Sequence, residues 1–224
     1  MNTIRWLLAL PFLVLAVAAW AAPFEARVVD GAGAGLADAV LWLTPSAARP
    51  AATAASASMD QRGLQFVPHV LVVQRSTTVS FPNSDQVRHH VYSFSPAKKF
   101  ELRLYKSIPA EPVVFDKAGI ATLGCNIHDW MLGYVVVVDT PYFAKTDDSG
   151  RLKIDEVPAG EYRLDLWHPR DLDAGTDRSE VIRIDAATPA RVFTIRTRPP
   201  PPVTPPTELE QKFRAYRKAP PGDA

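Results

Sequence analysis

Cysteine is nearly absent from this sequence: the 224 residues contain one, so no internal disulfide can hold the fold. No charge of one sign dominates either, because 25 basic and 24 acidic residues leave a formal net charge of +1. That balance gives no general attraction to nucleic acid or to anionic membranes. The apolar share of 47% is ordinary for a globular protein, which excludes wholesale disorder and a collagen-like repeat.

Long apolar runs are lacking outside the N-terminus. Residues 1–5 are a short basic stretch and residues 6–20 are apolar, while Ala19 and Ala21 place small residues where a signal peptidase recognises them. We therefore expect a signal peptide over residues 1–21, export to the periplasm, and no membrane span after its removal. The alternative is an uncleaved anchor, but the apolar run is short for a membrane span.

Short runs of β-branched and aromatic residues, separated by turn residues, dominate the chain between residues 24 and 198. Residues 100–104 alternate apolar and polar side chains as a half-buried strand does, and no stretch has a long helical period. Further strands are expected at residues 26–29, 39–43, 70–73, 78–81 and 135–138. The pattern predicts an all-β fold with β-sandwich architecture.

Two segments differ in composition from these runs. Residues 45–58 are rich in Ala, Ser and Pro and are interpreted as a loose linker. Residues 199–224 begin with a run of prolines, which favours an extended tail. Within it, residues 207–218 could form a short helix that docks a partner, but their composition favours a largely disordered tail.

Three potential metal ligands lie close together near the middle of the chain. Cys125, His128 and Met131 fall within seven residues, immediately before an apolar strand. A thiolate, an imidazole and a thioether are ligands that copper favours, and a trigonal Cys-His₂ site with a weak axial Met is the blue-copper arrangement. The second imidazole must come from a distant strand, where His89 and His90 are the candidates.

The chain from about residue 63 to residue 138 resembles a cupredoxin, most closely amicyanin and plastocyanin. The spacing of Asn83, His89 and Val91 is similar to that around the first copper histidine of these families. The ligand loop of amicyanin, Cys-x-x-His-x-x-Met-x-Gly, is matched by Cys125, His128, Met131 and Gly133. The resemblance implies a Greek-key β-sandwich that binds one type 1 copper, with His89, Cys125 and His128 as equatorial ligands and Met131 as the axial ligand.

Three positions depart from the family pattern. Arg88 precedes the first histidine where the family usually has Pro, and His90 follows it where Asn is usual. Ile127 precedes the second histidine, where Pro is frequent. Side chains beside the ligands tune the reduction potential and the rigidity of the site rather than the identity of the metal.

Each candidate also has an ordinary structural interpretation. Cys125 could be a buried, inert hydrophobe, and Met131 could serve core packing alone. Neighbouring strand residues point to opposite faces, so normally one of the two adjacent histidines enters the site. The resemblance favours His89, because Val91 then keeps the family's register; His90 as a second ligand in an unusual site is the alternative. His69 and His168 are distant from this group in sequence and are interpreted as structural or surface residues.

A Cys-His₂-Met site has no open coordination position, so we expect no enzymatic activity but one-electron transfer between redox partners. The resemblance places His128 at the protein surface, where Trp130, Leu132 and Pro68 would form a patch that docks a redox protein. The chain is expected to be a monomer. The alternatives are a non-redox copper-binding or storage protein, an envelope-interaction protein, or a zinc site.

The flanks of this region resemble a second family. Residues 22–44 and 144–198 contain turns and a Pro-Ala-Gly-x-Tyr hairpin, residues 158–162, that resemble carboxypeptidase regulatory-like, or transthyretin-like, β-sandwich domains. We expect a cupredoxin domain over residues 59–143 inserted into this split module. A tandem arrangement or one larger sandwich is the alternative. The flanking module shows no catalytic constellation.

Overall fold

The computed structural model describes residues 21–47, 51, 55–107, 111–174 and 178–199. These residues form 17 strands, β1 to β17, and no helix, which confirms the predicted all-β class. Accordingly, none of the described residues belongs to a helix that could cross a membrane. The predicted signal peptide, apart from Ala21, and all of the tail beyond residue 199 lie outside the described residues.

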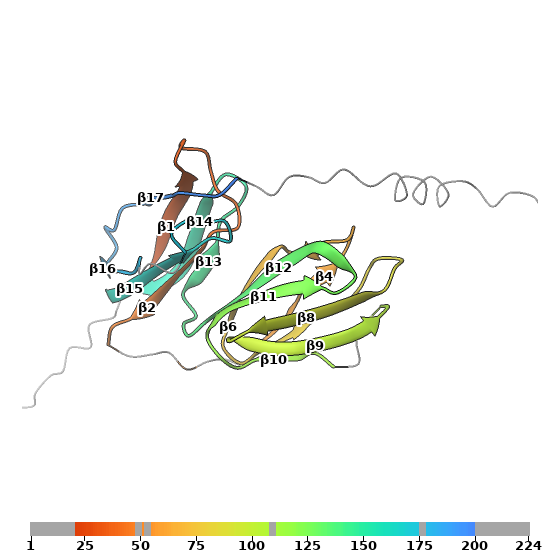
Figure 1. The fold of residues 1–224 in the computed structure, drawn as a ribbon. Helices are drawn as coiled ribbons and strands as arrows, with labels where there is room; N and C mark the ends of the chain where they lie inside the picture. Colours follow the sequence, from red (N-terminus) through yellow and green to blue (C-terminus); the bar gives the residue numbers. More distant parts are fainter. Residues whose placement is uncertain (1–20, 48–50, 52–54, 108–110, 175–177, 200–224) are drawn as a thin grey trace, which may run out of the picture.

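One group of strands combines the two ends of the described chain (Figure 1). Two sheets, ordered β14-β1-β17 and β13-β2-β15-β16, form it. Its members are β1 (Ala21–Asp30), β2 (Val40–Pro45), β13 (Phe143–Lys145), β14 (Arg151–Pro158), β15 (Gly160–Trp167), β16 (Glu180–Ile184) and β17 (Arg191–Ile195). Buried and exposed residues alternate along much of β14, so one face of its sheet packs on a core that includes Phe24, Leu41 and Leu164.

The second group is built from the middle of the chain. Its sheets are ordered β10-β7-β3 and β6-β12-β11-β8-β9, with a small β4-β5 pair. Its members are β3 (Ser56–Ser58), β4 (Asp60–Gln61), β5 (Phe66–Val67), β6 (Val70–Gln74), β7 (Thr77–Ser80), β8 (His89–Ser95), β9 (Lys98–Tyr105), β10 (Val113–Phe115), β11 (Gly119–Cys125) and β12 (His128–Val138). Phe66, Phe81, Phe115 and Leu123 are fully or almost fully buried in its core, which stabilises the sheets that carry the candidate ligands.

A third apolar cluster joins the two groups. Val40 of β2, Val70 of β6 and Val136 and Val138 of β12 are buried together there. The ring centroids of Tyr134 and Trp167 lie 5.3 Å apart across this contact. The first group of strands therefore covers the outer face of β12 near the C-terminal end of β12.

Both ends of the expected linker, residues 45–58, belong to strands, and Pro45 is the last residue of β2. Ser56–Ser58, at the end of the stretch 45–58, form strand β3, which pairs in parallel with β7. Ala57 packs against the core of the second group. Its Ser-Ala-Ser sequence has little strand preference, so pairing with β7 decides the conformation.

Candidate metal centre

Three strand ends carry the candidate ligands. His89 is the first residue of β8, Cys125 the last of β11, and His128 the first of β12. Cys125 pairs with His128 across a two-residue turn, and the pairing then shifts so that Gly124 lies opposite Leu132. The shift leaves residues 129–131 in a bulge, a distortion that re-aims side chains at the ends of sheets.

The three donor atoms of this group converge on one point. Nδ1 of His89 lies 3.2 Å from Nδ1 of His128, and the Cys125 Sγ lies 3.7 and 3.5 Å from these two nitrogens. A point equidistant from the three atoms lies about 2.0 Å from each, close to the metal–nitrogen and metal–sulfur bond lengths of about 2.0 and 2.3 Å found in zinc proteins. In the part of the chain that the structure describes, this is the group of His, Cys, Asp and Glu side chains arranged to hold a metal ion.

Hydrogen bonding favours the thiolate of Cys125. Burial raises the pKa of the thiol, but a hydrogen bond with His89, backbone N–H groups of His90 and Ile127, and a hydrogen bond with His128 outweigh it and lower the pKa to about 6. For His89, burial lowers the pKa, and the hydrogen bonds with Cys125 and Asp85 raise it by more. A thiolate is the form of cysteine that binds metals.

Asp85 is a site residue that the sequence analysis missed. Its Oδ2 accepts a hydrogen bond from Nε2 of His89 at 2.9 Å, on the side of the ring opposite Nδ1. Burial raises the pKa of Asp85, but hydrogen bonds from the Leu64 backbone, the His89 ring and the Gly63 backbone lower it by more. The available signal was a carboxylate four residues before a candidate ligand.

The structure separates the two adjacent histidines. His89 is completely buried within the cluster. His90 instead donates through Nε2 to Glu101 at 2.8 Å and lies outside the cluster. The strand pairing of β8 with β9 shifts between residues 89 and 91, so the separation arises at an irregularity of the sheet.

The remaining histidines lie outside the cluster. His168 is buried and its Nε2 donates to the carbonyl of Ala37. His69 is exposed, and its Nδ1 donates to the carbonyl of Leu132 at 3.0 Å. Both contacts are compatible with the structural or surface roles expected for them.

Met131 is almost fully buried and belongs to the same apolar cluster as Cys125. Its two neighbours in the chain, Trp130 and Leu132, are exposed instead. The structure thus turns this side chain inward near the end of the sheet that carries the cluster, and its role as axial ligand stays a prediction.

An exposed aromatic side chain lies beside His128, which is itself only partly buried. The ring of Trp130 lies 5.5 Å from the His128 ring, between centroids, and is 55% exposed. Ile127, Leu132 and Val67 are exposed as well, whereas Pro68, expected in this patch, is half-buried.

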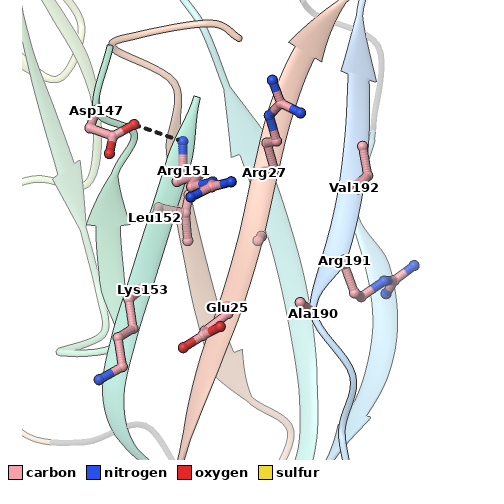
Figure 2. Close-up of a pocket in the computed structure, with 10 residues that line it drawn as sticks. Glu25, Arg27, Asp147, Arg151, Leu152, Lys153, Ala190, Arg191 and Val192 are labelled. Atoms are coloured by element: carbon pink, nitrogen blue, oxygen red, sulfur yellow. Dashed lines mark hydrogen bonds between the residues drawn. The ribbon is translucent and has the colours of Figure 1, made fainter. Parts of the chain in front are cut away.

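A separate pocket of about 390 Å³ lies on the sheet β14-β1-β17 (Figure 2). Charged side chains line much of it, among them Glu25, Arg27, Arg151 and Lys153. It contains no histidine or cysteine, and it lies on a different sheet from the His89-Cys125-His128 cluster. Its lining therefore offers nothing that belongs to the candidate metal centre.

Comparisons with known proteins found similarity among solved structures. No family model and no curated protein sequence matches. A copper-containing nitrite reductase from Thermus scotoductus SA-01 is similar at 25% identity over 37% of this chain and 22% of that chain, with a TM-score of 0.35. This chain thus spans about a fifth of that enzyme's length.

Two smaller proteins are similar over nearly their whole length. A purple cupredoxin from Nitrosopumilus maritimus has 23% identity over 37% of this chain and 99% of its own, with a TM-score of 0.30. An amicyanin variant in the Cu(I) form has 25% identity over 44% of this chain and 98% of its own, with a TM-score of 0.34. Because these TM-scores are below 0.5, the likenesses add no argument about function, and the family of the flanking strands stays a prediction.

Proposed function

We propose that this chain is an exported, periplasmic type 1 copper protein that carries single electrons between redox partners and catalyses no reaction of its own. The observation that carries this proposal is the triangle of donor atoms from His89, Cys125 and His128, with sides of 3.2 to 3.7 Å. Two imidazole nitrogens and one thiolate at this separation fit the equatorial plane of such a site.

The donor set favours copper over its competitors. Zinc also accepts Cys and His but rarely a thioether, and Met131, buried in the same apolar cluster as Cys125, is proposed to supply one. Copper bound there would supply a couple between Cu(I) and Cu(II). The chain contributes a donor set that is already assembled, so a change of oxidation state requires little rearrangement.

Burial supports a carrier rather than an enzyme. His89 and Cys125 are shielded from solvent, and His128 is the one ligand candidate of the three that reaches the surface. A catalytic metal site instead keeps a position open for substrate. The imidazole edge of His128 is thus the natural exit for an electron.

The proposed partner is a redox protein that docks on the apolar surface beside His128. Trp130, whose ring lies beside that of His128, is 55% exposed, and Val67, Ile127 and Leu132, which we propose to extend this surface, are between 42% and 48% exposed. Such a small apolar patch suits brief contacts with another protein, and the chain itself is proposed to act as a monomer. No interaction with nucleic acid is part of the proposal.

The test is the visible spectrum of the purified protein after addition of Cu(II), followed by voltammetry. We expect an intense thiolate-to-copper band and a reversible one-electron wave, both lost in Cys125→Ser. The His90→Ala variant serves as the matched control and should keep both signals. Copper binding without the band or without the reversible wave would refute electron transfer in favour of storage or a structural role, and preference for zinc would refute copper.

A further inference from the structure

We propose that Asp85 is a positioning residue for His89: its carboxylate holds the ring with Nε2 turned away from the cluster, so that Nδ1 is the atom presented to the metal. This inference rests on the proposed copper function for its redox consequence, but the positioning itself concerns the chain alone. Asp85 has no place in the ligand set predicted from the sequence.

The contact between the two side chains defines the orientation of the ring. Nε2 of His89 lies 2.9 Å from Oδ2 of Asp85, and the side chains are 0% and 15% exposed. A neutral imidazole has one N–H, and a carboxylate can only accept it. When the Cys125 sulfur is bound to a metal, it does not compete for this N–H, so Asp85 holds the proton on Nε2 and the lone pair of Nδ1 is free toward the cluster.

Asp85 is itself held in place by backbone groups. Its two carboxylate oxygens accept hydrogen bonds from the N–H groups of Gly63 at 2.7 Å and Leu64 at 2.9 Å. Its own N–H donates to Oδ1 of Asn83 at 2.9 Å. Two contacts on the carboxylate and one on its backbone leave Asp85 little freedom to move away from His89.

The turn that supplies these N–H groups has an unusual backbone. Gly63 and Leu64 have φ angles of 65° and 62°, and the Arg62 N–H closes the turn on the Gln65 carbonyl. A non-glycine residue such as Leu rarely adopts this left-handed conformation. Consecutive residues with these angles direct neighbouring N–H groups toward one acceptor, as in other anion-binding turns.

The negative charge of Asp85 is directed at His89. Among the ion pairs of the described residues, His89 is the partner of Asp85, while the nearby Arg62 pairs with Asp60. A carboxylate hydrogen-bonded to a ligand ring raises the basicity of that ring. This stabilises the more highly charged Cu(II) relative to Cu(I), so Asp85 lowers the reduction potential of the site.

The first experiment measures the ring directly in the metal-free protein. Cys125 is replaced by Ser in both samples, because the thiolate is a second acceptor for the ring proton, whereas a serine hydroxyl can donate to Nδ1. Nitrogen-15 NMR at a pH where the His89 ring is neutral should show a proton on Nε2 when Asp85 is present and a mixture of both tautomers in Asp85→Ala. A proton on Nδ1 with Asp85 present, or an unchanged ring in Asp85→Ala, would overturn the proposal, and neither result depends on copper.

The second experiment measures the reduction potential of the copper-loaded Asp85→Asn variant, which keeps the shape of the side chain and an acceptor oxygen. Loss of an outer partner typically costs 10- to 100-fold in metal affinity. If only the affinity for Cu(II) falls, the reduction potential rises by about 59 mV for each tenfold loss of affinity, or about 60–120 mV in all.

Asp129→Asn is the matched control for this second experiment. It removes the same charge from an exposed carboxylate next to His128, where solvent screens it. Equal shifts in the two variants would overturn the redox consequence. If the wild type lacks the intense thiolate band, the proposed function fails, and the tautomer measurement still decides whether Asp85 positions His89.

Discussion

Replacing each of the two adjacent histidines by alanine provides a direct test of the site, because the two changes are chemically identical. His89 is fully buried, and its ring contacts Asp85, Cys125 and His128. His90 contacts Glu101 at the surface of the sheet. The structure therefore predicts large effects for His89→Ala and small ones for His90→Ala.

The expected magnitudes follow from these contacts. Loss of a residue that only hydrogen-bonds to a metal ligand lowers metal affinity by up to roughly 100-fold. His89→Ala removes a candidate ligand itself, so its metal affinity should fall by more than that. It also removes a charge-assisted hydrogen bond to Asp85, which should cost the metal-free fold about 2–3 kcal/mol. The His90–Glu101 pair is partly exposed, so His90→Ala should cost below about 1 kcal/mol and leave metal affinity nearly unchanged.

Two measurements check this prediction. Competition with a chelator of known affinity gives the change in copper binding, and urea unfolding of the metal-free proteins gives the change in stability. Loss of the thiolate band in His89→Ala with retention in His90→Ala is the expected result. Equal losses in both variants would refute the assignment of His89 as the single ligand from β8.

Two further predictions concern packing and protonation. In Gly133→Ala, the new Cβ would lie 2.8 Å from the Cβ of buried Phe66, so urea unfolding should show that the free energy of unfolding falls by about 1–3 kcal/mol. Gly160→Ala is the control, because its new Cβ would lie 3.5 Å from the nearest atom and its stability should hardly change. Equal losses of stability in the two variants would contradict this reasoning. The Cys125 thiol of the metal-free protein should titrate near pH 6 when followed by ultraviolet absorbance. This transition should be absent from Cys125→Ser. A midpoint near 8.5 would show that the hydrogen bonds do not favour the thiolate. By linkage, this group stabilises the metal-free fold fully above the unfolded pKa of about 8.5, and the contribution is lost as the pH falls through about 6.

The arrangement of the second strand group explains how a short sequence motif becomes part of the His89-Cys125-His128 cluster. The β11–β12 hairpin brings Cys125 and His128 together locally, because their backbones pair across a two-residue turn. The neighbouring strand β8 pairs with β11 at residues 91 and 125, which places His89 beside the thiol. Two separate pieces of chain thus meet at one end of one sheet.

The sequence by itself determined the all-β class and the local half of the site. Period-2 patterns and turn residues depend on neighbours in the chain, and so does the spacing of Cys125 and His128. Strands form at each of the runs expected from those patterns. The resemblance of the spacing to the cupredoxin pattern also favoured His89 over His90, and that preference matches the residue that the structure brings into the cluster.

Only the tertiary structure decided the contacts between distant residues. The turn at Gly63 and Leu64 meets Asp85 across 21 and 22 residues of sequence, and β3 forms because β7 offers it a partner. The burial of Val40 against Val136 likewise depends on how two strand groups meet. No local pattern encodes these contacts, because each depends on where a second piece of chain lies in space, and that position is set by the packing of the whole sheet.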